Sequence, residues 1–93
     1  MPIPLEPDVA DVAPTGSVLT DYDVEHAITY LRLLHAAEDE ADWREVAHIV
    51  LRIDPDREND RARLSFDTHL ERARWMSSHG YRQLLRWPVQ IGH

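Results

Sequence analysis

Six histidines are the side chains of this sequence best suited to hold a metal ion, and their spacing decides against it. They are His26, His35, His48, His69, His79 and His93. A helical zinc site needs two histidines four residues apart with a carboxylate ligand, and no pair has that spacing. The absence of cysteine also excludes thiolate zinc sites and a cysteine nucleophile. We therefore expect no metal site and no cofactor.

Other catalytic chemistries find no suitable arrangement either. No Ser/His/Asp set or cleft with paired carboxylates can be identified, and the three glycines are isolated, so no phosphate-binding loop is expected. A chain of 93 residues forms one small domain, which leaves little room for the lid and cleft of an enzyme. We expect a protein that is not an enzyme and has no small-molecule substrate.

Three arginines could contact DNA phosphates: Arg57, Arg61 and Arg63. A DNA-reading helix normally carries excess positive charge, because phosphate neutralisation supplies most of the non-specific affinity. Between residues 54 and 75, however, five arginines stand beside six acids, and pairs such as Arg63 with Asp67 have the i, i+4 spacing of a helical ion pair. A small DNA-binding helix-turn-helix regulator is therefore the alternative interpretation.

Net charge favours a protein partner. Seventeen acids against ten arginines give a net charge of −7, and eleven of the acids lie in the first fifty residues beside only two arginines. An acidic surface repels the DNA backbone. We expect another protein as partner, in a heterodimer, and no nucleic acid.

Residues 1–19 precede the helices that must position these side chains. Four prolines in this segment exclude a regular helix, so we expect a flexible arm. No stretch of the chain approaches the roughly 18 apolar residues of a membrane span, and no secretory signal is present. We expect a cytoplasmic protein without membrane contact.

Helix signals follow the arm. A first helix begins at Thr20, which forms a capping-box pattern with Asp23, and runs to about Ala37. A second begins after Asp42, an N-cap residue, and stops before Asp54-Pro55, because the residue before a proline is pushed out of the helical region.

A third helix opens at Asn59 or Asp60 and ends at Gly80, and a short last helix covers Tyr81 to Arg86. The polar segment 54–59 makes an extended turn. The order is that of an all-α helix-turn-helix variant of about four helices, although a generic helical bundle shares it. The expected divisions are the Pro-rich arm 1–19, the helix-turn-helix-like domain 20–87 and the tail 88–93.

The first helix carries more apolar residues than one core requires. Its expected core stripe is Val24, Ala27, Ile28, Leu31 and Leu34. A second stripe, formed by His26, Tyr30, Leu33 and Ala37 at spacings of 4, 3 and 4, lies beside it. Either the tail or the third helix covers that stripe, or a partner protein does. The candidate partner-binding residues are His26, Tyr30, Leu33, Ala37 and Trp87.

Several short sequence motifs are spread along the expected helices and turns. They include Tyr22-Asp23, Tyr30-Leu-Arg-Leu-Leu34, Ala41-Asp-Trp-Arg-Glu-Val-Ala47, Ile53-Asp-Pro55, Arg61-Ala62-Arg63, His69-Leu70, Ala73-Arg-Trp-Met76 and His79-Gly-Tyr-Arg82. Together they resemble a proteobacterial family of extended-turn helix-turn-helix domains, over about Tyr22 to Arg86.

That resemblance implies a role in gene regulation. In the family the domain forms the DNA-binding half of FseA-type activators, which switch on excision and transfer of integrative and conjugative elements, and it also occurs alone in QseM-type antiactivators. The acidic charge and the absence of a second domain favour the antiactivator. Such a protein would dock on the activator's N-terminal domain, or on a LuxR/TraR-type quorum-sensing regulator, and block activation.

Overall fold

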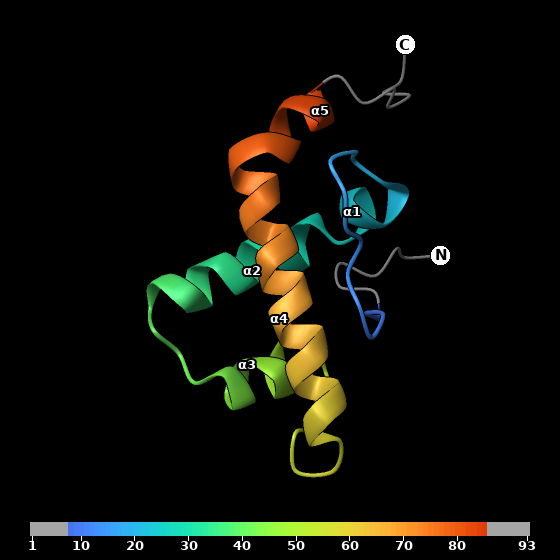
Figure 1. Ribbon diagram of the computed structural model, residues 1–93. Helices are drawn as coiled ribbons and strands as arrows, with labels where there is room; N and C mark the ends of the chain where they lie inside the picture. Colours follow the sequence, from blue (N-terminus) through green and yellow to red (C-terminus); the bar gives the residue numbers. More distant parts are fainter. Residues whose placement is uncertain (1–7, 86–93) are drawn as a thin grey trace, which may run out of the picture.

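The computed structural model describes residues 8–85 of the chain. All regular structure in this range is helical, which confirms the predicted all-α class (Figure 1). The elements are α1 (Asp21–Glu25), α2 (Ala27–Glu38), α3 (Trp43–Ile49), α4 (Asn59–Trp75), the π-helical turn η1 (Met76–Gly80) and α5 (Tyr81–Leu85). None of these described helices is long and apolar enough to cross a membrane.

The first predicted helix is in fact two helices, separated at His26. Thr20 caps α1 in the predicted capping box, since its hydroxyl accepts from the backbone N–H of Asp23 and its own N–H donates to the Asp23 carboxylate. His26 leaves the helical conformation, with φ −105° and ψ 19°. Its ring Nδ1 and its backbone N–H both lie within hydrogen-bond distance of the Tyr22 carbonyl.

The predicted core stripe of this region was wrong for Ile28 and Leu31, whereas Val24 and Leu34 pack partly buried against the core. Ile28 and Leu31 are 44% and 52% exposed, whereas Tyr30 and Leu33 are 2% and 1% exposed. The buried face follows spacings of 3, 4 and 3 through Asp23, His26, Tyr30 and Leu33. Two of these residues are polar and find partners inside, so counting apolar residues alone pointed to the neighbouring face.

The second helix begins as predicted, because the Asp42 side chain accepts a hydrogen bond from the first turn of α3. It ends at Ile49, five residues before the expected proline stop. Leu51 and Ile53 then turn into the interior on either side of the exposed Arg52, whose φ is 61°. The core between α2, α3 and α4 comprises Leu33, Val46, Ala47, Val50, Leu51, Ile53 and Ala62.

Gly80 does not end the third helix, which corrects the sequence prediction. The chain passes from α4 through η1 into α5 without a loop, as one continuous helical rod that bends near η1 (Figure 1). A Cβ at Gly80 would lie 2.4 Å from the ring of Trp75 and 2.7 Å from the sulfur of Met76. Glycine is therefore required here for close packing within the rod rather than as a helix cap.

Residues 8–19 have neither helix nor strand, as their prolines predict, and they lie against α4 and α5. The backbone N–H of Ala13 donates to Thr68 at 3.1 Å, and that of Leu19 donates to the Gln83 side chain at 2.7 Å. Ala13 and Leu19 are each only 3% exposed. This segment contributes side chains to the core, which the sequence analysis did not anticipate; residues 1–7 lie outside the described range.

Candidate nucleic-acid interface

The predicted DNA-contacting arginines lie at the end of the molecule where α3, the turn 50–58 and the start of α4 meet. Arg57 is exposed in this turn. Its guanidinium makes no hydrogen bond or ion pair with any residue between 8 and 85. Arg57, like the exposed Arg52 of the same turn, is therefore available to a phosphate.

Arg61, in the first turn of α4, is held by acids. Its side chain lies 2.6 Å from the carboxylate of Asp11 and 2.9 Å from that of Glu58. Hydrogen bonds to Asp11 and Glu58 raise the pKa of Arg61, so it stays a cation. These ion pairs are well exposed to water.

Arg63 makes the predicted i, i+4 ion pair with Asp67, at 3.1 Å. Its guanidinium carbon also lies 4.8 Å from the centre of the Trp43 ring, which joins α3 to α4 by a cation–π contact. The three arginines are thus at one end of the fold, but only one of them is unpaired.

The amino end of α4 offers further hydrogen-bond donors. Its N-cap residue, Glu58, makes no side-chain cap to the first turn. The first N–H groups of a helix have no intrahelical acceptor and carry partial positive charge, which attracts anions. Asn59, the first residue of α4, is exposed, and its amide side chain could read a base edge.

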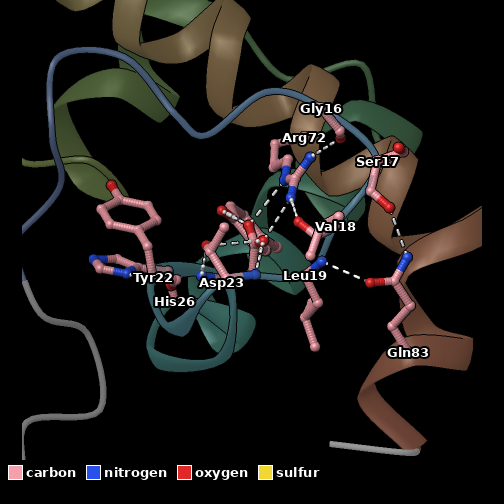
Figure 2. Close-up of polar contacts among 11 residues, drawn as sticks. Gly16, Ser17, Val18, Leu19, Tyr22, Asp23, His26, Arg72 and Gln83 are labelled. Carbon is pink, nitrogen blue, oxygen red and sulfur yellow. Dashed lines mark hydrogen bonds and ion pairs between the residues drawn. The ribbon is translucent and has the colours of Figure 1, made fainter.

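A buried ion pair fixes how α4 lies on the rest of the fold (Figure 2). Arg72 of α4 donates from Nε and Nη2 to the two carboxylate oxygens of Asp23, at 2.9 and 2.7 Å. The two side chains are only 3% and 0% exposed. This bidentate geometry is the strongest that an arginine and a carboxylate form, so it sets the angle and register of α4 against α1.

The carboxylate of Asp23 is fully satisfied inside the protein. It also accepts from the Tyr30 hydroxyl at 2.7 Å and from the backbone N–H and hydroxyl of Thr20. Burial alone would raise the pKa of Asp23, but hydrogen bonds from Arg72, Thr20 and Tyr30 outweigh it and hold this pKa below the ordinary value. Burial, together with the hydrogen bond to Asp23, raises the pKa of Tyr30 far above its usual range.

Arg72 fastens the N-terminal segment as well. Its Nη1 and Nη2 donate to the carbonyl oxygens of Gly16 and Val18, at 2.7 and 2.8 Å (Figure 2). Gly16 has a φ of +93°, a conformation that glycine adopts without strain and that turns the chain here. The guanidinium carbon lies 3.9 Å from the centre of the Trp75 ring. One side chain thereby joins α4, α1 and residues 16–18.

A second polar chain lies beside this pair. The Tyr22 hydroxyl lies 2.6 Å from Nε2 of His69, whose Nδ1 lies 2.7 Å from the carbonyl of Ser65. Because a carbonyl can only accept, Nδ1 carries the proton and the Tyr22 hydroxyl donates to Nε2. Burial lowers the pKa of His69, so the ring is neutral in the folded protein. This chain joins α1 to the middle of α4.

The predicted partner-binding residues lie mainly in the interior. His26, Tyr30 and Leu33 are between 1% and 3% exposed, Ala37 is half-buried, and Trp87 lies outside the described residues. The prediction that these side chains form a surplus surface was therefore wrong for the first three. Tyr30 is turned inward by its hydrogen bond to Asp23, and His26 by bonds to backbone carbonyls.

Arg72 was not predicted as a site residue, and Asp23 was predicted only as part of a helix cap. A signal was present, since Ser65, His69, Arg72 and Met76 follow one another at helical spacings of 4, 3 and 4. A charged residue at a core position of one helix calls for an opposite charge at a core position of another. Among residues 8–85, no cluster of histidines and acids is arranged to hold a metal ion.

Comparison with known families connects this geometry to DNA. Residues 5–86 match a family model, the RovC DNA-binding domain, described as "T6SS, Transcription factor, DNA binding domain". No curated protein matches the chain. The match contradicts the expectation that the chain has no nucleic acid partner. That expectation was based on net charge, which is a sum over the whole chain. The first half is acidic, but the last part, from residue 72 onward, contains four arginines and no acid.

Proposed function

Since the chain belongs to the RovC family of transcription-factor DNA-binding domains, we propose that it binds duplex DNA as part of a transcription regulator. The family match carries this proposal, because it spans all but the ends of the chain. The proposal assigns the protein no catalytic step. Its work is to bring a regulator to DNA through the α3, turn and α4 arrangement.

The arrangement suits a contact in the major groove. In helix-turn-helix domains the second helix of the motif enters that groove, and its first residues face the base edges. Here α4 is that helix, and its exposed first turn carries Asn59 and Arg61, with Arg57 directly before it. Arg57 would neutralise a phosphate, while Asn59 would face the bases.

The ion pairs of Arg61 and Arg63 do not prevent this contact. Exposed ion pairs contribute little net free energy, because water and salt screen them. A DNA phosphate can therefore replace a carboxylate as the partner of either guanidinium at little cost. The segment 50–64 is neutral overall, with four arginines and four acids, so we expect modest non-specific affinity that depends strongly on salt.

Fluorescence anisotropy with labelled duplexes tests the proposal. We expect the 93-residue protein to bind at low salt and to lose affinity steeply as salt rises. Arg57→Gln should weaken binding and reduce the slope of log K against log salt by about 1. Ile28→Glu, at an exposed position on α2, makes the same change in net charge and should leave binding nearly unchanged. Absence of binding at low salt would refute the proposal.

The antiactivator role is a second candidate, and one observation favours it. Ile28 and Leu31 form an exposed apolar pair on α2, beside the acidic Glu25. By resemblance to QseM-type proteins, such a surface would dock on an FseA-type activator or a LuxR/TraR-type regulator and block conjugative transfer. Co-purification with such an activator, lost in Ile28→Glu/Leu31→Glu, would support this role. No complex at micromolar concentration would refute it.

A further inference from the structure

The carboxyl-terminal part of the rod differs in charge from the rest of the protein. From residue 72 to the end, the sequence contains four arginines and no aspartate or glutamate, although the whole chain has a net charge of −7. Arg72 is engaged in its buried ion pair with Asp23. Between residues 72 and 85, the exposed arginines are Arg74 and Arg82.

These two arginines lie eight residues apart along the rod, with Ser78 midway between them. All three side chains are exposed, and the Ser78 hydroxyl donates to the carbonyl of Arg74 at 3.1 Å. Within residues 8–85 neither guanidinium has a hydrogen bond or ion pair. They differ in this from Arg61 and Arg63, which have acidic partners.

An open cleft beside Arg82 brings several polar side chains together. It has a volume of about 420 Å³ and is lined by Ser17, Trp75, Ser78, His79, Arg82 and Gln83. No carboxylate lines it. The Trp75 ring in its wall is held between Arg72 and the backbone at Gly80, and the Gln83 amide bonds to the carbonyl of Ser17 at 2.7 Å (Figure 2). The side chains of Trp75 and Gln83 in the wall of the cleft are therefore held in place by these contacts.

Its position fits a second contact with DNA. Arg63 and Arg74 are eleven residues apart on α4, which is three helical turns and about 16 Å along the axis. They therefore face the same side of the helix. The major groove is about 12 Å wide, so a helix that crosses it with Arg57 and Arg63 near one strand carries Arg74 toward the phosphates of the other. Arg82 lies further along the same rod, beyond η1.

We propose that Arg74, Arg82 and the cleft over Trp75 form a phosphate-contact site for the backbone of duplex DNA. The inference rests on the proposed function, to which it adds a second anchor away from the helix-turn-helix end. Phosphate contacts position a protein on the duplex without reading its sequence. The site should accordingly contribute equally to binding of unrelated duplexes.

The test is salt-dependent binding of Arg74→Gln/Arg82→Gln to two unrelated duplexes, measured by anisotropy. We expect weaker binding to both and a slope of log K against log salt reduced by about 2. Ile28→Glu/Leu31→Glu makes the same change in net charge on α2 and should keep the slope. Thermal melts of both variants would establish that they are folded.

The outcomes separate the inference from the proposed function. If the unchanged protein binds DNA and Arg57→Gln weakens binding, but Arg74→Gln/Arg82→Gln keeps affinity and slope, the phosphate site is refuted and the function stands. The same result with a tryptophan fluorescence response to inorganic phosphate would assign the cleft to a free phosphate ligand and also refute the DNA contact. No DNA binding by the unchanged protein would refute both.

Discussion

Arg72 and Asp23 form a bidentate ion pair in the interior, between residues 49 positions apart in the sequence. The pair holds α4 against α1, and Arg72 reaches on to the carbonyls of residues 16 and 18. Since α4 carries both the helix-turn-helix end and the arginines of the proposed phosphate site, this contact determines how both regions are presented.

Breaking this pair should be costly. In Asp23→Asn a buried guanidinium loses its counter-charge, and we expect the free energy of unfolding to fall by about 3 to 5 kcal/mol. Asp67→Asn is the matched control, because it removes the acid of the exposed pair with Arg63, and should cost about 0 to 1 kcal/mol. Urea denaturation of both variants measures the difference. Equal costs would mean that the interior pair has no special structural role.

Two leucines of α2 test which face of this helix is buried. Leu33 is 1% exposed and Leu31 is 52% exposed. Leu33→Ala should reduce stability by about 2 to 5 kcal/mol through lost burial and a cavity, while Leu31→Ala should stay within about 0.5 kcal/mol. Chemical denaturation monitored by circular dichroism compares them. A larger loss for Leu31→Ala would restore the face predicted from the sequence.

Gly80→Ala should destabilise the protein although it lies in a helical rod. Alanine normally stabilises a helix interior relative to glycine by about 0.5 to 1 kcal/mol. Here the added methyl group would lie 2.4 Å from the Trp75 ring, and such overpacking costs about 1 to 3 kcal/mol. The melting temperature should therefore fall. A rise would show that Trp75 is not packed on this residue.

His69 should make stability depend on pH. Burial lowers its pKa in the folded protein, so the unfolded chain binds a proton more readily. The stability that His69 contributes is fully present above the pKa of the unfolded chain, about 6.5. It is lost as the pH falls from there through the lower pKa of the folded protein. Melts at neutral and mildly acidic pH should show a smaller loss for His69→Gln than for the unchanged protein. An identical loss in the two proteins would contradict this role for His69.

Local signals predicted where α1, α3 and α4 begin. The Thr20 and Asp42 caps and the polar segment before Asn59 each depend on neighbouring residues, and each is where it was expected. The Arg63 and Asp67 pair was predictable for the same reason, because both residues lie on one helix.

Contacts between distant segments were not predictable from such signals. The partnership of Asp23 with Arg72 depends on how α1 and α4 cross, and it inverts the expected burial of α2 by bringing Tyr30 inward. The close approach of Trp75 to Gly80 arises from the π-helical turn η1, which no spacing rule indicated. An arginine without an ion pair can likewise be recognised only when the positions of the surrounding acids are known.

An NMR titration checks the claim that this domain binds duplex DNA through one side of α4, η1 and α5. Amide signals of the isotope-labelled protein would be followed as a short duplex is added at low salt. We expect the shifted signals to group around Arg57, Asn59 and Arg63 and around Arg74 and Arg82, and to recover as salt is raised. No shifted signals, or shifts confined to the Ile28 and Leu31 surface of α2, would contradict the claim.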